Sequence, residues 1–155
     1  MQRAIEIAER GRGKVQPNPL VGCVLVRDGK IIAEGWHGNI GGFHAEQAAI
    51  ADAEERGITT SGSTAYVTLE PCNHHGRTPP CTEALLWAGV ERVIVGALDP
   101  NPTVRGGGLS ALRDVGVSVK NGILEKECKH QMGEFIHWCE HRKPFVLSLI
   151  HISEP

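Results

Sequence analysis

The spacing of apolar residues predicts a helix at the beginning of the chain. Met1, Ala4, Ile5 and Ala8 recur at the three- and four-residue intervals that place side chains on one helical face, and the run ends at Gly11. Later segments with alanine-rich or periodic apolar positions, closed by glycine, predict further helices over 44–56, from about residue 80, over 109–115 and over 124–141.

Runs rich in β-branched residues predict the strands of a sheet. The runs 20–27 and 31–36 are separated by Asp-Gly at 28–29, which is a typical turn between antiparallel strands. The run 93–95 consists of consecutive β-branched residues, which indicates a strand that is buried on both faces. The remaining strands are expected over 64–69, 92–98 and 117–119.

The order of these elements is a hairpin followed by alternating helices and strands. This order predicts the α/β class, with a mixed sheet that is covered by helices on both faces. In such sheets, binding sites gather in loops at the carboxyl ends of strands. The candidate loops here contain Asn18, residues 70–79 and residues 99–101.

Length, composition and charge limit the possible classes of protein. The 155 residues suit one domain, and 41% apolar with 22% charged residues is an ordinary globular balance. The formal net charge of −2 gives no general attraction to nucleic acid or anionic membrane. No apolar run approaches the roughly 20 residues of a membrane span, and we expect no leader before the first helix. We therefore expect a cytoplasmic protein without a nucleic-acid or membrane partner.

Three residues with zinc-ligand side chains carry the candidate chemistry. They are His44, Cys72 and Cys81, and in a reducing cytoplasm the five cysteines of the chain are expected to be thiols or metal ligands. One imidazole and two thiolates leave the fourth position of a tetrahedral zinc open for water, as in catalytic sites. The ligands are expected at or near helix starts, where the helix dipole favours thiolate over thiol.

Glu46 lies two residues after His44, where its carboxylate can reach a water on the metal without binding the metal. Zinc deaminases combine the motif H-x-E with P-C-x-x-C and use the glutamate as acid and base. This chain departs from that motif, because eight residues separate Cys72 from Cys81. Tetrahedral geometry tolerates such an insertion if the loop between the cysteines folds back.

Two other interpretations of these residues stay open at this point. Cys72 and Cys81 could be ordinary buried thiols, with His44 as a helix-capping histidine. A closed structural zinc site would need a fourth protein ligand, for which His74 and His75 are near enough in sequence.

Four segments of the chain carry a family resemblance. They read PNPLVGCVLV at 17–26, GGFHAE at 41–46, TLEPCNHHGRTPPC at 68–81 and DPNPTVRGGG at 99–108. In this order they resemble the bacterial diaminohydroxyphosphoribosylaminopyrimidine deaminases, the amino-terminal half of a bifunctional riboflavin biosynthesis family. The eight-residue gap between the cysteines separates that family from cytidine, deoxycytidylate and tRNA-adenosine deaminases.

The resemblance implies a fold, a cofactor and a reaction. The fold is a cytidine-deaminase-like three-layer α/β/α sandwich with a five-stranded mixed sheet, and the cofactor is one Zn²⁺ per chain, held by His44, Cys72 and Cys81. The reaction is the hydrolysis of 2,5-diamino-6-(5-phosphoribosylamino)pyrimidin-4(3H)-one to 5-amino-6-(5-phosphoribosylamino)uracil and ammonia. Hydroxide on the zinc would attack the ring carbon that bears the amine, with Glu46 as proton shuttle.

The resemblance also implies six substrate contacts, from the pyrimidine edge to the phosphate: Asn18, His37, His74, Arg77, Asp99 and Asn101. The asparagine at 18 would bind the pyrimidine edge, the two histidines and the arginine would approach ribose and phosphate, and the last two residues would complete the rim. Taken alone, Arg77 matches phosphate oxygens as a bidentate donor or is a solvated loop arginine. The asparagines and the aspartate also fit turns beside prolines, and His37 alone is more typical of a surface histidine.

The resemblance ends near residue 146. Residues 147–155 do not match the family, which would continue into an NADPH-dependent reductase domain. We therefore expect a deaminase domain over 1–146, a non-native or truncated tail over 147–155, and no reductase activity. Similarity also suggests a homo-oligomer of two or more chains.

Two rival functions belong to other classes. A deaminase of nucleotides or tRNA would be expected to have the short Cys-x-x-Cys spacing, and a tRNA deaminase also a basic face; the sequence indicates neither. A zinc-stabilised binding module without catalysis would have no use for the proton shuttle that Glu46 provides.

Overall fold

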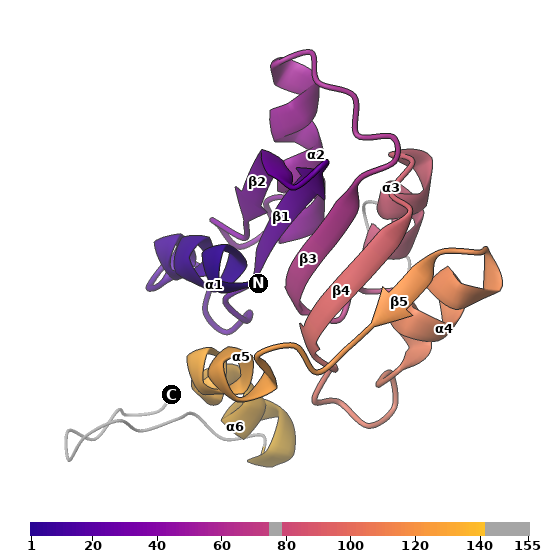
Figure 1. Cartoon of the computed structure of the whole chain (residues 1–155). Coiled ribbons are helices and arrows are strands. Elements are labelled where there is room, and N and C mark those ends of the chain that lie inside the picture. The colour runs from indigo at the N-terminus through magenta and orange to yellow at the C-terminus, as the bar shows by residue number, and fades with distance from the viewer. Residues whose placement is uncertain (75–78, 142–155) are drawn as a thin grey trace.

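A five-stranded mixed sheet lies at the centre of the computed structural model, which describes residues 1–74 and 79–141 (Figure 1). The strand order is β2-β1-β3-β4-β5, in which β1 is antiparallel to β2 and β3, and β3, β4 and β5 are parallel. The strands are β1 (Gly22–Arg27), β2 (Lys30–Trp36), β3 (Thr64–Leu69), β4 (Arg92–Ala97) and β5 (Ser118–Lys120).

Helices cover both faces of this sheet, as Figure 1 shows. One layer contains α2, α3 and α4 in a row, and the other contains α1, α5 and α6. The predicted three-layer α/β/α sandwich is therefore confirmed. The helices are α1 (Gln2–Ala8), which a 3-10 turn extends over Glu9–Gly11, α2 (Ala45–Glu55), α3 (Cys81–Trp87), α4 (Gly107–Asp114), α5 (Glu125–Gln131) and α6 (Gly133–His141).

Two glycines allow helices to approach the sheet closely from opposite sides. A Cβ atom on Gly22 would overlap the carbonyl oxygen of Ala4 in α1, and one on Gly35 would overlap the backbone nitrogen of Ala49 in α2. Gly35 pairs with Cys23, the neighbour of Gly22, and successive strand residues face opposite sides. The backbones of α1 and α2 therefore pack directly on the two faces of the hairpin.

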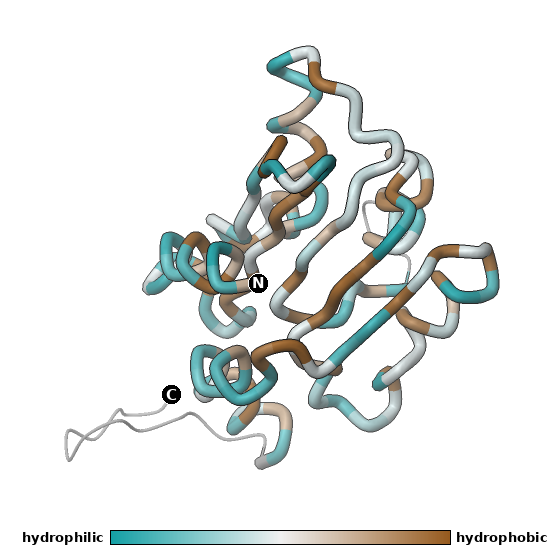
Figure 2. Tube along the Cα trace, in the orientation of Figure 1, coloured by the Kyte–Doolittle hydropathy of each residue, from teal (hydrophilic) through white to brown (hydrophobic). Residues whose placement is uncertain are grey.

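The centre of the sheet is the most apolar part of the molecule. Residues 93–97 of β4 are all buried, as the run of β-branched residues predicted, and Figure 2 shows the brown of apolar residues along this strand. Helices from both layers contribute to the same core, for example through Leu85 of α3, Leu109 of α4 and Cys128 of α5. Leu69 and Ala97, the last residues of β3 and β4, belong to this core, so the candidate loops begin at well-packed strand ends.

The prediction of one helix over 124–141 is wrong, because the chain forms α5 and α6 with a break between them. Met132, at the break, has φ −96° and ψ 20° and is only 2% exposed. Burial of the Met132 side chain in the core interrupts the helix at this point. The next residue, Gly133, is a weak helix former, which makes the interruption less costly. None of the described helices has the length and apolar character needed to cross a membrane.

Candidate metal centre and adjoining cavity

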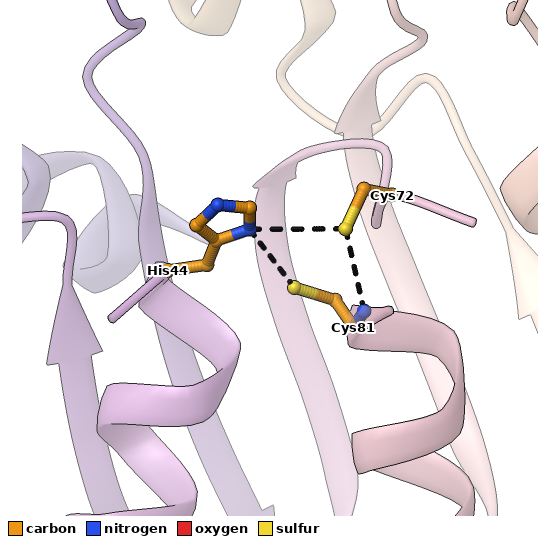
Figure 3. A group of neighbouring side chains, drawn as sticks. All are labelled: His44, Cys72 and Cys81. Atoms are coloured by element: carbon orange, nitrogen blue, oxygen red, sulfur yellow. Dashed lines mark hydrogen bonds between the residues drawn. The ribbon is translucent and has the colours of Figure 1, made fainter. Parts of the chain in front are cut away.

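Three side chains from separate segments converge beyond the end of β3 (Figure 3). His44 immediately precedes α2, Cys81 is the first residue of α3, and Cys72 lies in the loop after β3. The Nδ1 atom of His44 lies 3.3 Å from Sγ of Cys81 and 3.7 Å from Sγ of Cys72. Two of the three residues therefore lie at helix starts, as the sequence predicted.

These distances fit a tetrahedral zinc ion. At the tetrahedral angle, zinc–sulfur and zinc–nitrogen bonds of about 2.3 and 2.0 Å imply a nitrogen–sulfur separation of about 3.5 Å, and the two measured values lie on either side of it. His74 is described but lies outside this group, whereas His75 falls outside the described residues. The described part of the chain thus supplies three ligands, which is the number found in catalytic rather than closed structural sites.

The imidazole and the two sulfurs alter one another's protonation. The pKa of Cys72 is lowered to about 4, chiefly because its sulfur accepts a hydrogen bond from the Cys81 thiol and also because it contacts His44. The pKa of Cys81 is raised, since its thiol donates to Cys72 and is buried. The two sulfurs therefore share one proton in the metal-free protein. A metal cation replaces that proton and lets both sulfurs act as thiolates.

Glu46 lies in the first turn of α2, beside these ligands, and is 3% exposed. Burial is the main reason that its pKa is raised to about 7, and the negative charge of Cys72 raises it further. Its carboxylate also interacts with the side chain of Cys81. A carboxylate whose pKa lies near neutrality can both accept and donate a proton under physiological conditions.

A cavity of about 260 Å³ adjoins the three ligands and Glu46. Four of the six predicted substrate contacts line it: Asn18, His37, His74 and Asp99. Asn101 is not among the lining residues, and Arg77 falls outside the described residues. Asp99 and Asn101 do form the turn that their proline neighbours indicated, because Oδ1 of Asp99 accepts a hydrogen bond of 2.9 Å from the backbone N–H of Asn101.

His37 is not the surface histidine that its residue type alone favoured, because it is only 5% exposed. Its Nδ1 lies 2.9 Å from the carbonyl oxygen of Phe43, and its Nε2 lies 3.1 Å from the amide nitrogen of Asn18. Since a carbonyl only accepts, Nδ1 carries the proton and Nε2 accepts from Asn18. The ring also packs edge-on against His44, with centroids 5.8 Å apart. His37 thus connects Asn18 with a candidate metal ligand.

Two of the lining residues that sequence reasoning did not predict stand out by their position, Phe135 and Glu70. Phe135 comes from α6, a helix that no motif marks. Glu70 is buried at the end of β3, and its carboxylate accepts hydrogen bonds from backbone N–H groups of the loop before α4. A charged residue between an apolar strand and Pro71 was the available signal for Glu70.

Comparisons with known proteins agree with this geometry. A family model described as "Cytidine and deoxycytidylate deaminase zinc-binding region" matches residues 1–97. The riboflavin biosynthesis protein RibD of Actinobacillus pleuropneumoniae is 50% identical over 147 residues, which cover 95% of this chain and 38% of that protein. The diaminohydroxyphosphoribosylamino-pyrimidine deaminase of Buchnera aphidicola subsp. Schizaphis graminum is 49% identical over 136 residues, or 87% of this chain and 90% of that protein.

A solved structure of a related protein also matches this chain. The diaminohydroxyphosphoribosylaminopyrimidine deaminase/5-amino-6-(5-phosphoribosylamino)uracil reductase of Thermotoga maritima matches with a TM-score of 0.89 and 48% identity, over 94% of this chain and 41% of that one. The chain therefore spans less than half the length of the Actinobacillus and Thermotoga relatives. By its matched zinc-binding region and its identity to the Buchnera relative, the chain belongs to the zinc-dependent cytidine and deoxycytidylate deaminase family, on the branch named diaminohydroxyphosphoribosylaminopyrimidine deaminase.

Proposed function

We propose that the chain catalyses the hydrolytic deamination of 2,5-diamino-6-(5-phosphoribosylamino)pyrimidin-4(3H)-one. The products are 5-amino-6-(5-phosphoribosylamino)uracil and ammonia. The observation that carries this proposal is the convergence of His44, Cys72 and Cys81 beside the buried Glu46, at the edge of a cavity of about 260 Å³. The choice of substrate is supported by the 49% identity to a deaminase with that name.

In the proposed mechanism, His44, Cys72 and Cys81 hold one zinc ion. When bound, zinc is a Lewis acid that lowers the pKa of water from about 15.7 towards about 7. Glu46 takes the proton from the attacking water and places it on the ring nitrogen next to the carbon that bears the amine. The same carboxylate then takes the proton of the newly attached hydroxyl group and passes it to the amine, so that the carbonyl of the product forms as the carbon–nitrogen bond breaks and ammonia departs. Burial, which raises the pKa of Glu46 in the metal-free protein, favours a carboxyl group that both accepts and donates a proton.

The polar residues of the cavity are proposed to bind the rest of the substrate. The amide nitrogen of Asn18 donates to His37, so its oxygen is the acceptor that we assign to the pyrimidine edge. His37 itself uses both ring nitrogens within the protein, so we assign it a contact with the ribose through its ring carbons. The ribose and phosphate contacts of His74 and Arg77, and the rim contacts of Asp99 and Asn101, are carried over from the family resemblance.

Four wider predictions belong to the same proposal. The deaminase domain is proposed to cover residues 1–146, and the expected tail over 147–155 lies outside the described residues. A homo-oligomer and a cytoplasmic location are proposed on the family resemblance. The expected partner is a small molecule, which the size of the cavity supports.

A substrate comparison tests the proposed function. Zinc-loaded protein is incubated separately with the phosphoribosyl diaminopyrimidinone, with cytidine and with deoxycytidylate, and released ammonia is measured. We expect ammonia from the first compound, in equal amount to the uracil product, and none from the other two. Ammonia from cytidine or deoxycytidylate, with none from the pyrimidinone, would reject the assignment.

A further inference from the structure

The mechanism above leaves one buried carboxylate of the cavity without a role. Glu70 directly follows β3 and is 5% exposed. Its Oε1 accepts hydrogen bonds from the backbone N–H groups of Asp99 and Gly106, both at 3.0 Å. Its Oε2 accepts from Gly108 at 2.9 Å and from Leu109 at 3.4 Å. One side chain thus receives four backbone donors from the loop between β4 and α4 and from the first turn of α4.

This arrangement fixes the loop against the end of β3. Hydrogen bonds to an ionised acceptor are stronger than those between neutral groups, and a buried backbone N–H that loses its acceptor is costly. The loop backbone also lies directly on the strand extension, since a Cβ atom on Gly108 would overlap the carbonyl oxygen of Pro71. Asp99, at the start of this loop, lines the cavity.

The metal ligands have anchors of their own. The backbone N–H of Cys81 donates to Sγ of Cys72 at 3.3 Å, and that of Thr82 donates to the carbonyl oxygen of Cys72 at 3.2 Å. The backbone N–H of Glu70 is also held, by the carbonyl oxygen of Ala97 at 2.9 Å. Loss of the Glu70 carboxylate therefore releases the loop of Asp99 but leaves the main chain that leads to Cys72 in place.

We propose that Glu70 is a positioning residue that places Asp99 at the rim of the substrate cavity. Through Asp99 it governs the affinity for the substrate rather than the rate of proton transfer. The proposal rests on the proposed function, because Asp99 has a substrate to contact only if that function holds.

The variant Glu70→Gln tests this role, because it keeps the side-chain volume but offers one acceptor oxygen in place of two. For the zinc-loaded protein we expect KM for the phosphoribosyl diaminopyrimidinone to rise by about tenfold or more, and kcat to stay within about threefold. Zinc content is expected to remain near one per chain. In the double variant with Asp99→Ala, we expect KM to rise no further than in the more impaired single variant, because residues that act as one unit are not additive.

Glu91→Gln is the matched control, because Glu91 is an exposed glutamate just before β4, at the end of that strand away from the cavity. For this variant we expect wild-type kcat and KM. Three results would overturn the positioning role: a fall of kcat at unchanged KM, multiplicative effects of the two substitutions on KM, or loss of zinc from Glu70→Gln. Failure of the proposed function is seen separately, in the wild-type arm. A folded, zinc-loaded wild type that releases no ammonia from this substrate would remove both proposals.

Discussion

His37 shows how a residue of the cavity acts through its neighbours. Its Nε2 accepts from the amide of Asn18, and its ring supports His44 edge-on. The amide of Asn18 is thereby fixed in one of its two orientations: its NH2 group donates to His37, and its oxygen is available to accept a hydrogen bond. Orientation of this kind matters for a residue that is proposed to distinguish one pyrimidine edge from another.

We predict that His37→Phe weakens substrate binding more than it slows the reaction. Phenylalanine keeps the aromatic contact with His44 but cannot accept the hydrogen bond from Asn18. Loss of a hydrogen bond worth about 1–1.5 kcal/mol should raise KM about tenfold, with a smaller effect on kcat. Steady-state kinetics of the zinc-loaded variant measure both constants. His130→Phe, at an exposed position of α5, is the control, and an unchanged KM in His37→Phe would count against the orienting role.

The residues of the candidate metal centre could be predicted from the sequence, but the hydrogen-bond partners that hold the other cavity residues in place could not. His44, Cys72 and Cys81 carry recognisable ligand chemistry, and the structure brings the three together. The partners of His37 and Glu70 include backbone groups of loops, such as the carbonyl of Phe43 and the N–H of Asp99. The course of those loops depends on tertiary packing, which no local motif records.

The position of α2 links the fold to the metal centre, because His44 and Glu46 stand at its amino end. The helix lies against β2 where Gly35 has no side chain, and a Cβ atom there would overlap the backbone of Ala49. The placement of His44 and Glu46, two candidate active-site residues, therefore depends on Gly35, a glycine in the preceding strand.

We predict that Gly35→Ala destabilises the protein and lowers its zinc content. The added methyl group has to push α2 away from the sheet, and overpacking of this kind costs about 1–3 kcal/mol of the free energy of unfolding. Urea unfolding and zinc analysis give the two readouts. Gly133→Ala, where a Cβ atom meets open space, should be neutral or slightly stabilising. Equal stability of the two variants would show that α2 tolerates displacement.

The prediction of elements succeeded where local pattern and tertiary structure agree. The strand over 64–69 has the predicted bounds, and the buried β4 was predicted from its consecutive β-branched residues. The prediction of one continuous helix over 124–141 was wrong, because burial of Met132 interrupts a segment whose local pattern is continuous. A break of this kind depends on what the side chain packs against, and periodicity carries no information about that.

The whole molecule brings together the loops that the sequence had marked. The parallel strands β3 and β4 end at the same edge of the sheet, and Glu70 and Asp99, which come after them, line one cavity. Asn18, from the loop before β1, lines the same cavity. The α/β class and this convergence follow from pattern and topology. The substrate does not, because one fold carries many reactions, and it rests here on family membership.

Replacement of Glu46 by glutamine tests the proposed chemistry most directly. The amide keeps the size of the buried side chain but cannot carry a proton from water to the ring. Ammonia release from the phosphoribosyl diaminopyrimidinone is measured at saturating substrate, with zinc determined in the same samples. We predict that kcat falls by about 10²- to 10⁴-fold while zinc remains near one per chain. Turnover at the wild-type rate by a zinc-loaded Glu46→Gln protein would contradict the central role of this carboxylate.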